Sequence, residues 1–455
     1  MKKLLLCLSL ATALLLISCG GDNTTETEST GALGETASET VVAPEEAEKE
    51  IVTEVTTHGA SDTAEVTVEN VTSVDTVAET EAPTTETPVE TQEVTMEETS
   101  AEQVTEMQPS ETQGEMESET ESETESETES EVEPVKTFKN PLLDRAAADP
   151  CIVYHDGYYY GTYTEAVGIS LFRSTTLENL FKDEKVTVFS IGNEVQGNIW
   201  APELFYNPST DRWYIYSCGS TEGWDFFTIR MFCLESKTND PFGEYEFKAF
   251  TDPDLLAIDQ TMFYDEKSGT LYTAYSEFTA DGQVIMLAVM ENPWTISDQR
   301  LRVSYPRFDW EKKGERPDKD SRVNEGPVFL EHDGKLSIIY SASGCWSEYY
   351  CLGLVEFDGD DFSAGEMIRR NNWKKRTSPV FSAANEVYGV GHCSFFTSPD
   401  GSETWIAYHG MPTPDAGEEG RYAYAQKITF RDDGIPVLGE PLSRDTEIPV
   451  PSGEA

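Results

Sequence analysis

Residues 323–346 read VNEGPVFLEHDGKLSIIYSASGCW, and they place one acidic residue directly before a β-hairpin. Glu325 precedes a Gly-Pro dipeptide, in which glycine gives the backbone freedom and proline restricts it. An apolar strand follows, His-Asp-Gly at 332–334 predicts a tight turn, and residues 335–343 alternate as a second strand. The stretch therefore predicts a strand–turn–strand unit with a carboxylate held at its start.

The same unit recurs along the chain. Five such hairpins have second strands that contain, in order, Tyr163, Tyr216, Tyr275, Tyr340 and Tyr408. These tyrosines are 53, 59, 65 and 68 residues apart, which leaves room for a four-stranded antiparallel sheet and its loops in each interval. Regularly repeated sheets predict an all-β fold, a five-bladed β-propeller. The alternative is another all-β architecture that happens to contain aromatic hairpins.

The N-terminus has the features of a secretory signal. Two lysines precede an apolar run at residues 4–17, which is shorter than the ~20 residues that a membrane-spanning helix needs. The run ends in LISCG at residues 16–20, which resembles a bacterial lipobox with Cys19 as the acylated residue. We expect residues 1–18 to be a lipoprotein signal peptide. The protein should then lie outside the cytoplasm, attached to the bacterial cell membrane through a lipid on Cys19.

Residues 19–135 have the composition of a disordered linker rich in Thr, Glu and Ser. Between residues 20 and 134 there are 34 acidic residues, one basic residue, Lys49, and almost no aromatic residues. Such a segment cannot bury a core, and repulsion between its charges extends it. We expect a spacer between the membrane and the folded domain; an acidic binding tail is the alternative.

The remaining residues, 136–455, are rich in Tyr, Trp, Phe and Gly and are expected to form one domain, which we expect to be a monomer. They carry 51 acidic and 29 basic residues, which argues against nucleic acid or anionic lipid as a partner and favours a neutral ligand. Six cysteines lie here without the spacing of a zinc site. Most should be single buried thiols, although Cys345 and Cys351 could pair across a short loop.

Three acidic residues lie a similar short distance before their hairpins, namely Asp149, Asp259 and Glu325. In a propeller these would be equivalent positions on innermost strands, so we expect the three carboxyls to converge at one end of the central channel. Converging carboxylates suit glycoside hydrolysis, in which one carboxylic acid protonates the leaving oxygen and one carboxylate activates water. A third carboxylate would raise the pKa of the acid and keep it protonated.

At these residues the sequence resembles glycoside hydrolase family 43, whose members are five-bladed propellers that hydrolyse arabinose- and xylose-containing plant polysaccharides with inversion. The similarity extends over about residues 140–439. The matching pieces are ADP at 148–150, IWAPEL at 199–204, Ile258-Asp259, VNEGP at 323–327, SASGCW at 341–346, Gly391-His392, SPDG at 398–401 and WIAYH at 405–409.

The resemblance implies roles for the three acids: Asp149 as general base, Asp259 as pKa modulator and Glu325 as general acid. The stretch at 341–346 with the Gly-His pair looks most like the α-L-arabinofuranosidase branch, which would release L-arabinofuranose from arabinan or arabinoxylan. Substrate-binding roles are expected for Trp200, Glu203, Trp346 and Arg421.

His392 matches a histidine that in many relatives helps to hold a central ion, often calcium. A structural calcium ion in the channel is therefore expected at His392, whereas the chemistry itself requires no cofactor. The sequence departs from the common pattern at Gln260, where Gly or Pro is common, and at Cys393, where Asn is common. These departures concern the ion site and substrate detail and leave the acids intact.

Other functions remain alternatives. A β-xylosidase or an endo-arabinanase would have the same fold, because loops such as residues 311–322 set the depth of the pocket. Fructan-cleaving propellers carry an Arg-Asp-Pro signature, which the Arg-Phe-Asp sequence at 307–309 breaks. A surface lipoprotein that only binds glycans is the alternative from another class, and the three intact acids argue against it.

Overall fold

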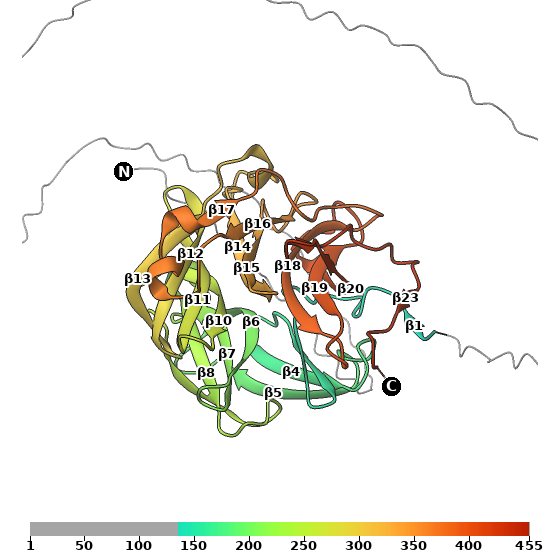
Figure 1. Ribbon diagram of the computed structural model, residues 1–455, viewed down its shortest axis with the longest axis horizontal. Coiled ribbons are helices and arrows are strands. Elements are labelled where there is room, and N and C mark those ends of the chain that lie inside the picture. The colour runs from blue at the N-terminus through green and yellow to red at the C-terminus, as the bar shows by residue number, and fades with distance from the viewer. Residues whose placement is uncertain (1–134, 455) are drawn as a thin grey trace, which may run out of the picture. The chain divides into compact units, whose positions relative to one another are not determined.

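A computed structural model describes residues 135–454 of the protein. The expected signal peptide, Cys19 and nearly all of the expected linker lie outside the described residues. Sheets follow one another along the chain and are arranged around a common centre (Figure 1). The sequence-based prediction of an all-β, five-bladed propeller is confirmed.

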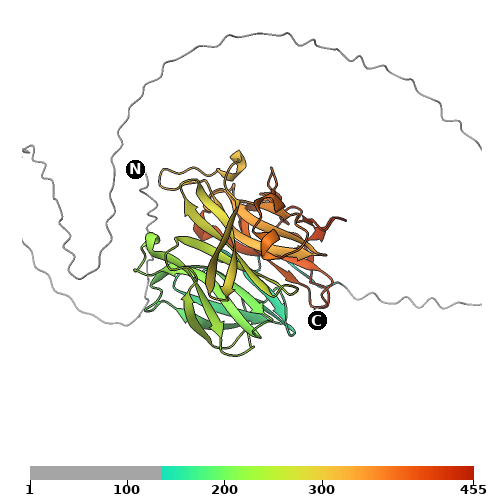
Figure 2. The same cartoon turned by 60° about the vertical axis from the view of Figure 1, so that its left-hand side comes forward.

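Four blades are complete four-stranded antiparallel sheets, whose strands lie in sequence order from the axis outward. Blade 1 contains β2 (Cys151–His155), β3 (Tyr158–Thr162), β4 (Gly168–Ser174) and β5 (Glu184–Ser190). Blade 2 contains β6 (Gly197–Asn207), β7 (Arg212–Ser220), β8 (Ile229–Ser236) and β9 (Tyr245–Phe250). Blade 3 contains β10 (Ala257–Asp265), β11 (Thr270–Thr279), β12 (Gly282–Asn292) and β13 (Thr295–Ser304). Blade 4 contains β14 (Asn324–His332), β15 (Lys335–Ala342), β16 (Cys351–Phe357) and β17 (Trp373–Lys375). Figure 2 shows the sheets of blades 2 and 3 in green and yellow.

Blade 5 is completed by the beginning of the domain. Its own strands are β18 (Tyr388–Thr397), β19 (Thr404–Met411) and β20 (Tyr422–Lys427). The segment after β1 runs beside β20: the Leu142 N–H donates to the Ala423 carbonyl (2.8 Å), and the Asn140 side chain bonds both the N–H and the carbonyl of Ala425. This contact joins the first part of the domain to the last and closes the ring of blades.

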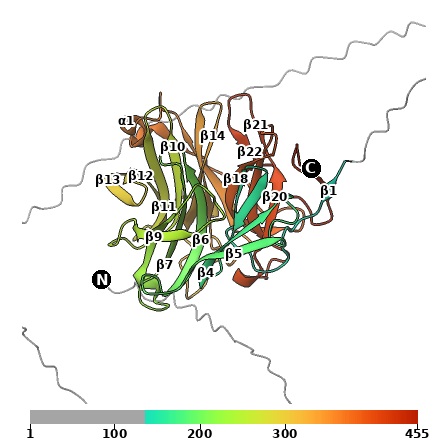
Figure 3. The same cartoon turned by 90° about the horizontal axis from the view of Figure 1, so that it is seen from below.

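Two short strand pairs finish the domain. β1 (Thr137–Phe138) pairs with β23 (Ile448–Pro449), so both ends of the domain lie side by side (Figure 3). β21 (Thr429–Phe430) pairs with β22 (Pro436–Val437). The helices are single turns: α1 (Ala364–Met367), η1 (Phe226–Thr228), η2 (Asp309–Glu311), η3 (Arg370–Asn372) and η4 (Glu418–Gly420). Within residues 135–454, no helix is long and apolar enough to cross a membrane.

The hydrophobic core lies between neighbouring blades. Ile169 and Leu171 of blade 1, for example, are fully buried in one cluster with Trp213 and Ile215 of blade 2. All five hairpin tyrosines are buried, which explains their regular spacing, because each blade presents the same strand to its neighbour. The six cysteines in this part of the chain are free thiols, so Cys345 and Cys351 do not pair.

Candidate active site

The innermost strands of blades 2 to 5 are irregular at the same place, next to the propeller axis. In four blades the pairing with the second strand shifts between Trp200 and Glu203, Ile258 and Thr261, Glu325 and Val328, or Gly391 and Ser394. Inside these bulges, and at the start of blade 1, one residue has a left-handed backbone: Asp149, Ala201, Asp259, Gly326 or His392, with φ between 43° and 60°. Bulges re-aim side chains, and strained backbone of this kind gathers at functional sites.

The bulges correct one expectation about the three acids. Asp149 and Asp259 do share a position, because both have the left-handed backbone, but Glu325 lies one residue earlier, at the position of Trp200. A bulge sets two residues against one, so two successive side chains face the axis. Gly326 takes the strained place behind Glu325. A Cβ atom there would lie 2.9 Å from the ring of His392, so the position requires glycine.

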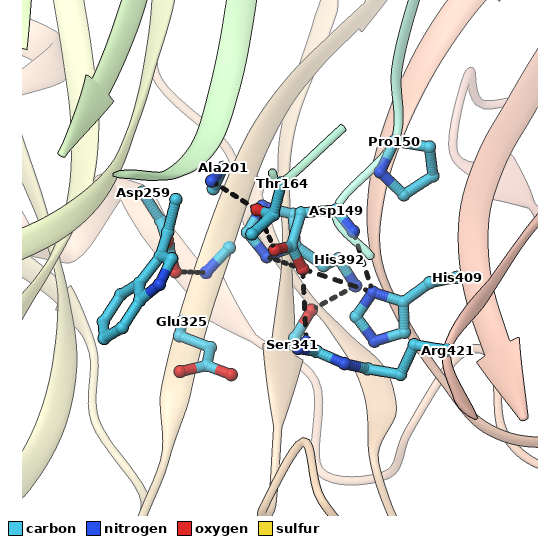
Figure 4. A network of polar contacts seen from close by, with 12 residues as sticks. Asp149, Pro150, Thr164, Ala201, Asp259, Glu325, Ser341, His392, His409 and Arg421 are labelled. Atoms are coloured by element: carbon cyan, nitrogen blue, oxygen red, sulfur yellow. Dashed lines mark hydrogen bonds and ion pairs between the residues drawn. The ribbon is translucent and has the colours of Figure 1, made fainter. Parts of the chain in front are cut away.

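The three acids nevertheless meet at one end of the propeller axis, as the sequence predicted. They come from blades 1, 3 and 4, each is at most 9% exposed, and Figure 4 shows them gathered at the centre. The Gly326 N–H donates to Asp259 Oδ2 at 2.9 Å, which ties the strand of Glu325 to Asp259.

Asp149 lies among hydrogen-bond donors and positive charges. Its Oδ2 accepts from the Thr164 hydroxyl at 2.6 Å, and its Oδ1 lies 3.3 Å from His392 Nδ1, 3.3 Å from His409 Nδ1 and 3.5 Å from Arg421 Nη1 (Figure 4). Burial raises the pKa of this carboxyl, but the charges of His392 and Arg421 and the contact with His409 outweigh burial. The net pKa of Asp149 lies well below its ordinary value, so the group is an anion at neutral pH.

His409 fixes the backbone of Asp149. The Asp149 N–H donates to His409 Nδ1 at 3.2 Å. Burial lowers the pKa of His409 to about 4, which keeps the ring neutral, and the ring stacks on Tyr350 at 5.3 Å. Sequence reasoning did not assign His409 a role, although the residue ends a motif, WIAYH, that carried the resemblance.

Glu325 lies in surroundings that favour its protonated form. Its Oε1 accepts from the Tyr350 hydroxyl at 2.8 Å and its Oε2 from Gln283 Nε2 at 3.0 Å. Burial raises the pKa of Glu325, these two hydrogen bonds lower it, the charge of Asp149 raises it again, and the net shift is upward. Burial and the charges of Glu325 and Asp149 also raise the pKa of Asp259. Because the charge of Glu325 disfavours ionisation of the buried Asp259, the two carboxyls do not both ionise readily, and the pair retains a proton.

A buried ion pair supports the strand of Glu325. Lys375 Nζ contacts Glu311 Oε1 and donates to Asn324 Oδ1 at 3.0 Å, while Asn324 Nδ2 donates to Glu311 Oε1 at 3.0 Å. The Tyr340 hydroxyl donates to the same oxygen. The two charged side chains are 0% and 2% exposed. This network fixes the residue immediately before Glu325, and no motif in the sequence indicated that Lys375 and Glu311 meet.

We expect Lys375→Met to lower the free energy of unfolding by about 3–5 kcal/mol, because it leaves the Glu311 carboxylate buried without an opposite charge beside it. Lys237→Met is the matched control, since Lys237 forms an ion pair with Glu244 at the surface and should leave the unfolding midpoint unchanged. Urea denaturation followed by tryptophan fluorescence measures both. Equal, small shifts of the two midpoints would show that the buried pair contributes nothing.

The four expected substrate-binding residues lie in different places. Arg421 faces Asp149, and Trp200 shares the bulge position of Glu325 and packs against Phe226. Trp346 is half-buried; its indole N–H donates to the Gly314 carbonyl at 2.7 Å.

Glu203 lies on β6, three residues after Trp200. It lines an axial cavity of about 240 Å³ that is formed by the innermost strands directly after the acids. Burial raises the pKa of Glu203 to about 8, against a lowering contact with the Cys151 thiol. The charge of Asp149 also raises the pKa of Glu203, and Glu203 in turn raises that of Asp259, so a substrate-binding role for Glu203 stays a prediction.

The expected calcium site has few protein side chains that could act as ligands. Across residues 135–454, no group of three or more His, Cys, Asp or Glu side chains is arranged to hold a metal ion. The ring nitrogen Nδ1 of His392 lies near Asp149, and the backbone N–H of His392 donates to the Ser341 hydroxyl at 2.8 Å. These residues do not make a metal site by themselves. A calcium ion at His392 stays a prediction, and no step proposed below uses it.

Fold and site together define a β-propeller with three buried carboxyl groups at one end of its axis, those of Asp149, Asp259 and Glu325. The sequence profile of "Glycosyl hydrolases family 43" matches residues 138–436, and the chain belongs to this family. The resemblance found in the sequence is thereby confirmed.

Several relatives carry an arabinofuranosidase name. The chain is 34% identical to an "Extracellular exo-alpha-(1->5)-L-arabinofuranosidase" of Streptomyces avermitilis, over 68% of this chain and 65% of that protein. It is 34% identical to a protein of the same name from Streptomyces chartreusis, over 60% of this chain and 82% of that protein. Among solved structures, an α-L-arabinofuranosidase from Lactobacillus brevis has 29% identity and a TM-score of 0.60, over 68% of this chain and 98% of that one. The chain thus spans about two thirds of the first of these relatives.

Proposed function

We propose that this protein is an inverting α-L-arabinofuranosidase that removes L-arabinofuranose from arabinan, arabinoxylan or their oligosaccharides. The observation that carries this proposal is the contrast between the surroundings of two carboxyls: Asp149 faces Arg421 and His392, which lower its pKa, whereas Glu325 is buried near the charge of Asp149, and its pKa is raised. When the surroundings of two carboxyls move their pKa values apart in this way, the carboxyl with the lower pKa can act as the base and the one with the higher pKa as the acid. The arabinose specificity rests on the names of the relatives.

In the proposed reaction, the Asp149 carboxylate accepts a proton from water as that water attacks the anomeric carbon. Glu325 donates its proton to the leaving oxygen as the glycosidic bond breaks, so that charge develops on neither product. Asp259 acts through Glu325: its buried carboxyl makes ionisation of Glu325 costly and keeps the acid protonated. Arg421 and His392 hold Asp149 as an anion.

We further propose that the enzyme works outside the cytoplasm, tethered by a lipid on Cys19. The extracellular names of the Streptomyces relatives support an external location, and the lipobox-like sequence at residues 16–20 supports the anchor. Arabinan and arabinoxylan, the proposed partners, are plant polysaccharides that a cell meets outside its envelope.

The stereochemistry of the first product tests the proposed mechanism. We expect the β-anomer of arabinofuranose to form first from an α-arabinofuranoside, because a water molecule activated by Asp149 attacks from the face opposite the leaving group. Proton NMR detects this anomer before mutarotation when enzyme is plentiful. First appearance of the α-anomer would contradict the inverting mechanism. A matching β-xylopyranoside is the specificity control: faster turnover of the xyloside than of the arabinofuranoside would overturn the arabinose assignment.

A further inference from the structure

Two large aromatic side chains lie exposed on the loop between β7 and β8. Trp224 is 54% exposed and Phe227 is 50% exposed. Within residues 135–454 no other Trp or Phe stands among the large exposed hydrophobic residues. Aromatic surface of this size is costly to leave in water, so its exposure calls for a ligand.

The loop lies at the same end of the propeller as the three acids. Gly197, at the start of β6, pairs with Ser220, at the end of β7, and Trp200 in the bulge pairs with Cys218. The loop that follows Ser220 therefore begins only a few residues along the strand from the bulge. The exposed aromatics thus stand at the rim of the active site, on blade 2.

A line of aromatic rings connects this rim to the axis. Phe227 packs edge-on against Phe226, with ring centroids 5.7 Å apart, and Phe226 packs against Trp200 at 6.4 Å. Phe226 also packs against Phe278 of blade 3, at 5.1 Å. Packed aromatic side chains therefore connect the rim to the bulge.

The loop holds these rings in place before any ligand arrives. The Phe227 N–H donates to Asp225 Oδ1 at 3.0 Å, and Asn198 Nδ2 donates to the Trp224 carbonyl at 3.2 Å. The indole of Trp224 lies against Gly197, where an added Cβ would come within 2.9 Å of the ring. Since the rings are already ordered, binding to them costs little conformational entropy.

We propose that Trp224 and Phe227 form a second carbohydrate contact, which holds the polysaccharide chain beside the active site while one arabinose unit occupies it. This inference rests on the proposed function and extends it from the cleaved sugar to the polymer that carries it. A neutral sugar ring fits the surface, because its C–H face packs on an aromatic ring and its hydroxyls reach the exposed acidic neighbours Glu222 and Asp225. The same two acids disfavour an anionic lipid surface.

Kinetics on two substrates test the proposal, with the Trp224→Ala and Phe227→Ala variants of the full chain. We expect KM for polymeric arabinan to rise ~3–10-fold in each variant, because a lost stacking contact is worth roughly that factor. kcat/KM for 4-nitrophenyl α-L-arabinofuranoside should stay within about twofold of wild type, since this small substrate does not reach the rim. Val437→Ala, an exposed apolar residue of β22, is the control and should change neither value.

The remaining outcomes decide against the proposal or against the proposed function. Unchanged KM for arabinan in both variants would overturn the second contact, and so would an equal loss on both substrates, which would mean that Trp224 only supports the site. If the wild-type protein hydrolyses neither substrate, the proposed function fails. Affinity electrophoresis in gels containing arabinan or arabinoxylan then tests the contact alone: retardation that Trp224→Ala abolishes would support it, and absence of retardation would overturn it.

Discussion

Replacing Glu325 with glutamine is expected to lower kcat on an unactivated arabino-oligosaccharide by about 10²–10⁴-fold while the protein still folds. The amide has the shape of the carboxyl, and its oxygen accepts from Gln283 while its NH₂ donates to the Tyr350 hydroxyl, so the local hydrogen bonds survive. An amide has no proton to give to the leaving oxygen. Steady-state release of arabinose from arabinotriose, with thermal unfolding as the folding control, measures the effect.

An activated substrate separates this role from a general loss of the site. 4-Nitrophenolate leaves with little protonation, so the variant should retain far more activity on the 4-nitrophenyl arabinofuranoside. Its activity should also no longer fall as the pH rises through the pKa of Glu325, because that proton is no longer needed. Glu331→Gln, an exposed acid on the same strand, serves as the matched control. Wild-type kcat on the oligosaccharide would remove Glu325 from its proposed role.

Replacing Asp149 with asparagine is expected to lower kcat by about 10²–10⁴-fold on both kinds of substrate, because water must be deprotonated whatever the leaving group. This equal loss distinguishes the base from the acid. The ratio of oligosaccharide to 4-nitrophenyl activity should thus stay near wild type in Asp149→Asn and fall in Glu325→Gln. The two ratios, measured side by side, assign the roles independently of the absolute rates.

The change at Asp149 also removes the charge that faces Arg421, so folding needs its own control. Asp156→Asn is well matched, since Asp156 has a similar left-handed backbone, with φ of 46°, but lies in an exposed turn. It should leave kcat unchanged. If Asp149→Asn kept its activity on the nitrophenyl substrate and lost it only on the oligosaccharide, Asp149 would be acting as the acid, and the proposed assignment would be reversed.

Much of the architecture could be predicted because it depends on short-range patterns. The aromatic hairpins repeat at intervals of one blade, and each hairpin forms from neighbouring residues, so the blade count followed from the spacing of Tyr163 to Tyr408. The proline after Asp149 and the Gly-Pro after Glu325 likewise indicated strand starts from adjacent residues alone. Local signals of this kind do not depend on what the blade packs against.

Contacts between blades could not be predicted in the same way. The sequence did not indicate that His409 would bind the backbone of Asp149, 260 residues earlier, or that Lys375 would reach Glu311. Nor did the sequence indicate that Glu203 would line the axial cavity, three residues along the strand from Trp200. The one-residue offset of Glu325 could not be predicted either, because a bulge changes which side chains of a strand face the axis.

The sequence by itself therefore determined the five hairpins, the three acids and the family, because these depend on residue types and on their spacing along the chain. Only the tertiary structure decided which acid is charged. Asp149 and Glu325 are both buried carboxyls, and their pKa values move apart because Arg421 and two histidines from blade 5 face Asp149, whereas at Glu325 burial and the charge of Asp149 outweigh the hydrogen bonds from Tyr350 and Gln283. Electrostatic surroundings depend on distances in space, and the closure of the ring sets those distances.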